Sequence, residues 1–179
     1  MEAKIIQLQS LDQLEKWIKA FERHDINRSQ EYYHKCLEEN INGTRITLFA
    51  VVNDEIAGCS HLKYKSDYLY FLESGIPEIN DLNVFIEYQR QGIANRLMDE
   101  FEGQISRTHK KIGIGVGLYK DYGTAQRIYC RRGYIPDGNG VSYNNQIVKP
   151  GSMICVDDDL ILYFIKDLSQ YKLFFGGSL

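Results

Sequence analysis

Residues 78–97 read EINDLNVFIEYQRQGIANRL, and this stretch carries the strongest local signal in the chain. A short apolar run that favours β-structure, with Leu82, Val84, Phe85 and Ile86, leads into a polar turn ending at Gly92. A helix is expected after the glycine, because apolar residues then recur every four positions, at Ile93, Leu97, Phe101 and Ile105. The stretch therefore predicts a strand, a glycine turn and an amphipathic helix.

This arrangement is a natural anion site. The first amides of a helix have no intrahelical partner, and the helix dipole places partial positive charge there. Gly92 would let a phosphate approach the backbone, because it has no Cβ. Arg90, Gln89 and Gln91 could close on the phosphate oxygens. The alternative is a turn glycine before a helix that binds no ligand.

A second segment, residues 125–134, reads AQRIYCRRGY. Ala125, Ile128 and Tyr129 share one helix face, and Gly133 is typical of the residue that ends a helix in left-handed conformation. This pattern should arise by chance on the order of 0.002 times in such a chain, so it is specific. A glycine-laced strand is expected between the two motifs, at 112–118.

In this order, the two segments resemble motifs A and B of the GNAT superfamily of N-acetyltransferases. The resemblance covers roughly residues 1–168, and its specific part is 78–134. It implies a mixed α/β fold, with a mixed but mostly antiparallel central sheet flanked by helices. It also implies acetyl-CoA as the donor cosubstrate, attacked directly by a primary amine in a ternary complex.

The resemblance also implies roles for individual residues. The backbone of Leu82, Asn83 and Val84 would pair with pantetheine and the acetyl group, and Tyr129 would be the general acid. The turn that would hold the pyrophosphate comprises Gln89, Arg90, Gln91, Gly92, Ile93, Ala94 and Asn95. Tyr122 stands where the family often has an asparagine that binds the pantetheine arm. Tyr122 and Gln126 are candidate cofactor contacts, and Ala94 replaces the commoner glycine.

The general base is open between two carboxylates and water. Glu78 and Asp81 begin the motif A strand, where either could accept a proton from the amine directly or through water. The alternative is a solvated carboxylate at a strand edge. The acidic run Asp157, Asp158 and Asp159 favours a solvated face, although it could also attract a cationic amine.

Composition excludes several classes of protein. The chain has 179 residues, 44% of them hydrophobic and 25% charged, with a net charge of −3 and no basic stripe, so no nucleic-acid partner is expected. No apolar run approaches the roughly 18 residues that span a bilayer, so no membrane partner is expected. The four cysteines and four histidines lack the spacing of metal ligands, which predicts no metal and a cytoplasmic protein with free thiols.

One domain over 1–179 is expected, with a tail from about residue 169. Strands are predicted at 4–8, 46–52, 55–64, 112–118 and 160–165. Helices are predicted after the capping box Ser10-x-x-Gln13 and over 29–39. Residues 67–77 look irregular, and 137–151 looks like a long loop or a hairpin. The tail at 171–179 is expected either to pack on the body or on a second subunit, or to be a frayed terminus, so a homodimer is a candidate state.

Two functions remain open on the sequence. The leading one is N-acetyl transfer to a small amine, an amino-acid derivative or a peptide amine. Tyr129 and the carboxylates beside motif A favour it. The alternative is a non-catalytic acyl-CoA-binding sensor or interaction module on the same fold, favoured by the loss of the asparagine at position 122.

Overall fold

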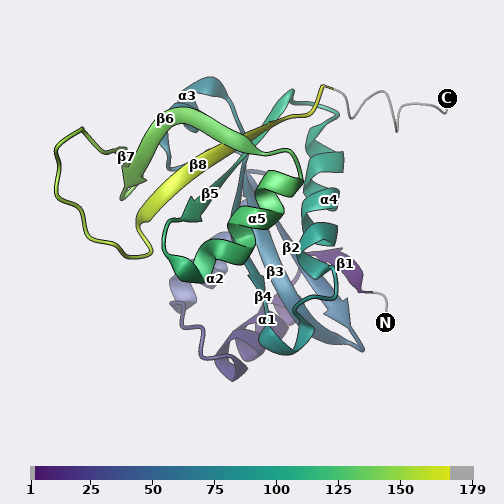
Figure 1. The fold of residues 1–179 in the computed structure, drawn as a ribbon. Helices are drawn as coiled ribbons and strands as arrows, with labels where there is room; N and C mark the ends of the chain where they lie inside the picture. The colour runs from purple at the N-terminus through teal and green to yellow at the C-terminus, as the bar shows by residue number, and fades with distance from the viewer. Residues whose placement is uncertain (1–2, 170–179) are drawn as a thin grey trace. The chain divides into compact units, whose positions relative to one another are not determined.

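The computed structural model describes residues 3–169 (Figure 1). These residues form two compact units, one made of 3–63 with 80–101 and the other of 64–79 with 102–169. In the described residues, no helix has both the length and the apolar character needed to cross a membrane. The expected tail at 171–179 lies outside the described residues.

The first unit is built from an N-terminal strand, two helices and a hairpin. Its elements are β1 (Lys4–Gln7), α1 (Leu11–Arg23), α2 (Gln30–Ile41), β2 (Arg45–Val52) and β3 (Glu55–Lys63). Ser10 caps α1 by accepting a hydrogen bond from the backbone of Gln13 at 3.3 Å, as the capping box predicts. The Gln13 side chain accepts in return from the backbone N–H of Gln9, one residue before the cap.

The hairpin of β2 and β3 turns at Asn53 and Asp54, both with positive φ. Two consecutive residues of this kind make the two-residue turn whose twist suits antiparallel strands. The register places Thr47 opposite His61. The buried faces of α1 and α2 pack on the hairpin through an aromatic core that includes Trp17 and Phe49.

Motif A supplies β4 (Glu78–Val84), a short 3₁₀ helix η1 (Ile86–Tyr88) and α4 (Ile93–Ile105). The strand therefore starts and ends earlier than its apolar residues suggest, since Ile86 opens η1. Gly58 of β3 permits β4 to come close, because a Cβ there would lie 2.5 Å from the carbonyl oxygen of Asn83.

The second unit contains α3 (Leu69–Ser74), β5 (Lys111–Gly117), η2 (Lys120–Tyr122), α5 (Gly123–Arg131), β6 (Ile135–Tyr143), β7 (Gln146–Ile147) and β8 (Leu160–Asp167). Its core stacks the rings of Tyr68 and Tyr163 at 3.8 Å. The ring of Phe71 on α3 packs directly against Gly113 of β5, and a Cβ at position 113 would clash with that ring. A long connection over 148–159 leads from β7 to β8 (Figure 1).

The hydrogen-bonded order of the strands is β1-β2-β3-β4-β5-β8-β6-β7. The pairing of β4 with β5 is parallel, whereas β1–β2, β2–β3, β5–β8, β6–β8 and β6–β7 are antiparallel. This confirms the predicted mixed α/β fold with a mostly antiparallel sheet and flanking helices.

Two local expectations need correction. Residues 67–77 are not wholly irregular, because α3 forms there and ends at Gly75 in left-handed conformation. Its N-cap residue, Tyr68, makes no side-chain capping bond, so the usual start signal is missing. The stretch 137–151 is the hairpin alternative rather than a plain loop, because β6 and β7 pair across a turn at Asn144 and Asn145.

Candidate active site

The motif A turn presents exposed backbone. Residues 89–92 are exposed, and the turn bends through positive φ at Arg90 (60°) and Gly92 (81°). A Cβ built on Gly92 meets no atom within 4 Å, so the space beside it is open. The side-chain amides of Gln89 and Gln91 donate back to the carbonyls of Val84 and Glu87. The first amides of α4 follow directly, as an anion site requires.

Asp81 occupies an unusual position in β4. Its φ is +51°, a left-handed value inside a strand, which Asp tolerates better than most residues. Strained backbone of this kind is often found at functional sites. The side-chain amide of Asn83 donates both to the Asp81 carbonyl and to Oδ1 of its carboxylate, at 3.1 and 2.8 Å.

Asp81 is the end point of a group of polar side chains from β2, β3, β4, α2 and the connection before α2. We call this group the Asp81 network, and it comprises Arg28, Tyr32, Asn40, Thr47, His61, Asp81 and Asn83. The Tyr32 hydroxyl donates to Oδ2 of Asp81 at 3.1 Å, and Arg28 Nη2 lies 3.3 and 3.4 Å from the two carboxylate oxygens. Nε2 of His61 lies 3.0 Å from the Tyr32 hydroxyl. The Asp81 side chain nevertheless keeps 21% of its surface exposed.

The electrostatics of the network keep Asp81 charged and His61 neutral. Burial by itself would raise the pKa of Asp81, but the His61 ring, the Arg28 guanidinium and the hydrogen bonds from Asn83 and Tyr32 together outweigh it and hold the pKa below its usual range. Burial lowers the pKa of His61 to about 3, so its ring is neutral at pH 7. Burial and the nearby Asp81 carboxylate raise the pKa of Tyr32, which therefore keeps its proton.

Glu78, the other candidate base, has a different setting. Glu78 is only 3% exposed. The Ser66 hydroxyl donates to its Oε2, and the same hydroxyl accepts from the backbone N–H of Tyr68. This environment fits a carboxylate that fastens the connection before α3.

Motif B forms α5, which ends as its sequence predicts, with Gly133 at φ +84°. Tyr129 lies on this helix and is 5% exposed. Burial raises the pKa of its hydroxyl, so Tyr129 is protonated at neutral pH, as a general acid must be. Among residues 3–169, no hydrogen bond engages that hydroxyl, which leaves its proton for another partner.

The two other candidate residues near motif B, Tyr122 and Gln126, make hydrogen bonds within the second unit. The Tyr122 ring covers Gly117, where a Cβ would lie 2.4 Å from it, and its hydroxyl donates to Asp158 at 2.8 Å. The Tyr119 hydroxyl also donates to Asp158. Gln126 donates to the Gly117 carbonyl at 2.8 Å. Asp157 of the same acidic run accepts from the Tyr143 hydroxyl at 2.9 Å, so two carboxylates of the run have defined local partners.

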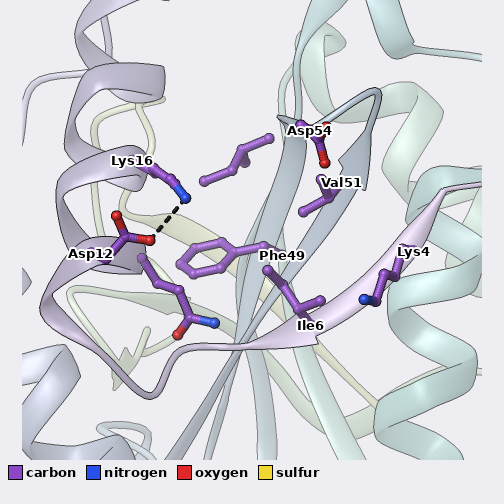
Figure 2. Close-up of a pocket in the computed structure, with 9 residues that line it drawn as sticks. Lys4, Ile6, Asp12, Lys16, Phe49, Val51 and Asp54 are labelled. Atoms are coloured by element: carbon purple, nitrogen blue, oxygen red, sulfur yellow. Dashed lines mark ion pairs between the residues drawn. The ribbon is translucent and has the colours of Figure 1, made fainter.

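A separate pocket of about 310 Å³ lies in the first unit (Figure 2). Its lining consists of Lys4, Ile6, Asp12, Gln13, Lys16, Phe49, Val51, Asp54 and Ile56. Figure 2 shows the ion pair of Asp12 and Lys16, 2.8 Å apart on α1, above the Phe49 ring. The pocket includes none of the predicted site residues. Within residues 3–169, no group of three or more His, Cys, Asp or Glu side chains is arranged to hold a metal ion.

Sequence reasoning missed most of the Asp81 network. Arg28, Tyr32, Thr47 and His61 come from separate elements and form no motif. One signal was available, because the predicted hairpin with its Asn53–Asp54 turn sets a register that pairs Thr47 with His61. The sequence offered no comparable signal for Arg28 or for α2.

Comparison with known proteins identifies the family. The model of the acetyltransferase (GNAT) domain matches residues 12–149, so the chain belongs to the GNAT family. A search of curated proteins found no significant sequence match.

Solved structures share the fold at low sequence identity. An N-acetyltransferase from Staphylococcus aureus Mu50 is 11% identical, with a TM-score of 0.67 over 94% of this chain and 99% of that one. The ribosomal-protein-S18-alanine N-acetyltransferase from Escherichia coli is 14% identical, with a TM-score of 0.66 over 93% and 94%. An aminoglycoside 6'-N-acetyltransferase complexed with coenzyme A is 17% identical, with a TM-score of 0.62 over 92% and 97%. At these identities the likeness establishes the fold.

Proposed function

We propose that this protein is an N-acetyltransferase that transfers the acetyl group of acetyl-CoA to a cationic primary amine by direct attack in a ternary complex. The observation that carries the proposal is Asp81. Its carboxylate is held ionised and partly exposed, directly before the backbone segment that is expected to hold the acetyl group in this family. A charged carboxylate in that place suits an ammonium group.

The donor would be bound by motif A. The backbone of Leu82, Asn83 and Val84 would pair with pantetheine and the acetyl group. The pyrophosphate would lie on the turn from Gln89 to Asn95, where the space beside Gly92 is open. The side chains of Tyr122 and Gln126 would have to leave their present partners before they could contact the cofactor.

The acceptor would be a small amine, an amino-acid derivative or a peptide amine. Two of the structural neighbours support an amine, because one is named for acetylating aminoglycosides and another for acetylating an alanine of a ribosomal protein. In this chain, Asp81 would attract the protonated amine. Arg28 lies 3.3 Å from the same carboxylate with an exposed fraction of 37%, and this pairing supports the proposal that the place suits a cation.

Two proton transfers accompany the reaction. The ammonium must lose a proton before its nitrogen can attack the acetyl carbonyl, and the departing CoA thiolate must gain one. Because the pKa of Asp81 lies below its usual range, Asp81 would hold and orient the ammonium, while water carries the proton away. Tyr129 would give its hydroxyl proton to the thiolate sulfur and later regain it from solvent.

Donor binding is the first test. Calorimetry should show that acetyl-CoA binds the wild-type chain, and Gly92→Val should abolish the binding by placing a branched side chain on the phosphate site. Gly92→Asn is the matched control for backbone strain, because Asn tolerates the positive φ at this position far better than Val. If both variants bind acetyl-CoA more weakly and Gly92→Asn keeps the wild-type melting temperature, the side chain itself blocks the phosphate, which then lies beside Gly92. Undiminished binding in Gly92→Val would contradict the proposal.

A non-catalytic acyl-CoA-binding module is the second candidate. It is favoured by the engagement of Tyr122 and Gln126 inside the second unit, at the positions expected to serve the pantetheine arm. A broad panel of primary amines separates the two functions. Release of CoA with any of them supports the enzyme, whereas acetyl-CoA binding without release supports the module.

A further inference from the structure

The Asp81 network begins at Asn40, whose side-chain amide has one permitted orientation. The backbone N–H of Thr47 needs an acceptor and lies 2.7 Å from one end of the amide, which must therefore be the oxygen Oδ1. The carbonyl oxygen of Cys36 can only accept and lies 2.7 Å from the other end, which must therefore be Nδ2. The amide is assigned from these two backbone partners.

This orientation decides what the Thr47 hydroxyl can do. Asn40 Nδ2 donates to Thr47 Oγ1 at 2.8 Å, so the hydroxyl accepts there. Nδ1 of His61 lies 2.8 Å away on the other side. Thr47 is fully buried, and a buried hydroxyl proton without an acceptor is costly. The hydroxyl therefore donates to Nδ1, and Nδ1 carries no hydrogen.

A neutral imidazole that accepts at Nδ1 carries its hydrogen on Nε2. Nε2 lies 3.0 Å from the Tyr32 hydroxyl, so His61 donates to Tyr32. Tyr32 then uses its own proton for Oδ2 of Asp81, at 3.1 Å. An independent distance agrees, because Nε2 is 3.9 Å from the same carboxylate oxygen, where a hydrogen is favourable and a lone pair is not.

We propose that a one-way hydrogen-bond chain from Asn40 fixes Tyr32 as a donor to Asp81 and so positions that carboxylate for the acceptor's ammonium group. Its members, in order, are Asn40, Thr47, His61, Tyr32 and Asp81. Tyr32, His61 and Thr47 are positioning residues, since Asp81 alone is assigned to the substrate. The role of Asp81 rests on the proposed function, whereas the direction of the chain rests on the contacts alone.

Other charged and titratable groups face this chain from every element around it. They are Arg28 before α2, Tyr33, Cys36 and Glu39 on α2, Arg45 on β2, and Cys59 and Lys63 on β3. The three cations disfavour a charged His61 ring. A neutral ring with a single hydrogen is the state in which the direction of the chain is defined.

NMR tests the direction without any substrate. Long-range ¹H–¹⁵N spectra of the His61 ring at pH 7 should show a neutral imidazole with its hydrogen on Nε2. Thr47→Ser should keep this form because it keeps the hydroxyl, whereas Thr47→Val should weaken the preference for it. A wild-type ring with its hydrogen on Nδ1, or a protonated ring, would overturn the proposal.

The link to Asp81 is tested by titrating its carboxyl carbon by NMR. Tyr32→Phe removes one donor, so the midpoint of the Asp81 titration should move up by about one pH unit. Tyr33→Phe is the matched control, since it removes a hydroxyl from the next residue of the same helix and should leave the midpoint in place. A midpoint that does not move in Tyr32→Phe refutes the positioning role.

Kinetics separate this inference from the proposed function. With an amine that is turned over, Tyr32→Phe should raise KM for the amine several-fold and leave KM for acetyl-CoA unchanged. If both constants rise together, Tyr32 acts on the fold rather than on Asp81. If no amine is turned over, the proposed function fails, and the two NMR experiments still decide the direction of the chain and its hold on Asp81.

Discussion

Asp81 and Glu102 each accept a hydrogen bond from a tyrosine hydroxyl and each lie beside an arginine, but their surroundings are opposite. Glu102 is fully buried and is held by Arg132 through two nitrogens at 3.1 and 3.0 Å. Lys166 reaches it at 2.7 Å and Tyr134 at 3.0 Å. Asp81 is partly exposed, has one cation at 3.3 Å and sits on strained backbone.

The difference separates a structural carboxylate from a functional one. The Glu102 cluster, which we define as Glu102, Arg132, Tyr134 and Lys166, ties the end of α4 to the end of α5 and to β8. Its short contacts leave the carboxylate closed to solvent. The Asp81 network holds its carboxylate with a more distant cation, 3.3 Å away, and leaves part of it open. A carboxylate that must receive a substrate cation needs that opening, and one that stabilises a fold does not.

The largest expected effect is on stability, at Glu102. Glu102→Gln keeps the shape but removes the charge that compensates Arg132 and Lys166, and breaking a buried pair in this way costs about 3–5 kcal/mol. Urea denaturation of the variant should show this loss in the free energy of unfolding. Asp81→Asn is the matched control and should lose far less. Equal losses of unfolding free energy in the two variants would contradict the distinction between a structural Glu102 and a functional Asp81.

The second effect is on activity, at Asp81. Asp81→Asn keeps the size of the side chain and tolerates the positive φ, but it removes the charge that would hold the ammonium. We expect kcat/KM for the amine to fall about 10²-fold to 10³-fold, the range expected when one partner of a desolvated charge pair is removed. Glu78→Gln, the same change at the buried carboxylate bonded to Ser66, should leave kcat/KM close to wild type. The reverse ranking would make Glu78 the functional carboxylate.

Tyr129 gives the third effect, in the motif B helix. If it protonates the departing thiolate, Tyr129→Phe should lower kcat about 10²-fold, the low end for one general acid. Because only the hydroxyl is lost, the affinity for acetyl-CoA in calorimetry should stay near wild type. Steady-state assays that show an unimpaired kcat would make Tyr129 a packing residue of α5.

Local signals in the sequence predict much of the fold. Apolar spacing gives the helix after Gly92, the pair Asn53 and Asp54 gives the hairpin, and Gly133 gives the end of α5. Each of these signals acts over a few residues. By contrast, α3 has only six residues and no capping side chain, so nothing in its sequence marks its start.

The site is predictable in one respect and not in another. Motif A places Glu78 and Asp81 beside the segment expected to hold the donor, so the sequence narrows the functional carboxylate to these two residues. The partners of Asp81 cannot be selected in this way, because they join positions 49 and 53 residues apart. The same holds for Glu102, which meets Arg132 and Lys166 across 30 and 64 residues. Tertiary packing alone makes these groups.

The last effect is a pH dependence of stability that comes from His61. An unfolded histidine takes up a proton below pH of about 6.5, whereas the pKa of folded His61 is lowered to about 3 by burial. Between these values the unfolded state binds more protons, so the free energy of unfolding falls as the pH falls. One such group contributes a slope of up to about 1.4 kcal/mol per pH unit. The lowered pKa of Asp81 adds stability that is lost only at more acidic pH, below its unfolded value of about 3.9.

His61→Gln isolates this slope. Glutamine can accept from Thr47 with its carbonyl and donate to Tyr32 with its amide, so it keeps the direction of the chain and takes up no proton. Urea denaturation at steps from pH 6.5 to 4.5 should therefore show a shallower decline in the variant than in the wild type. Near pH 7 the variant should be less stable than wild type, because glutamine packs less well than the imidazole ring. The two curves of unfolding free energy against pH should converge as the pH falls. Parallel curves would show that His61 takes up no proton on unfolding. The assignment of a neutral, buried His61 ring, on which the direction of the hydrogen-bond chain depends, would then be wrong.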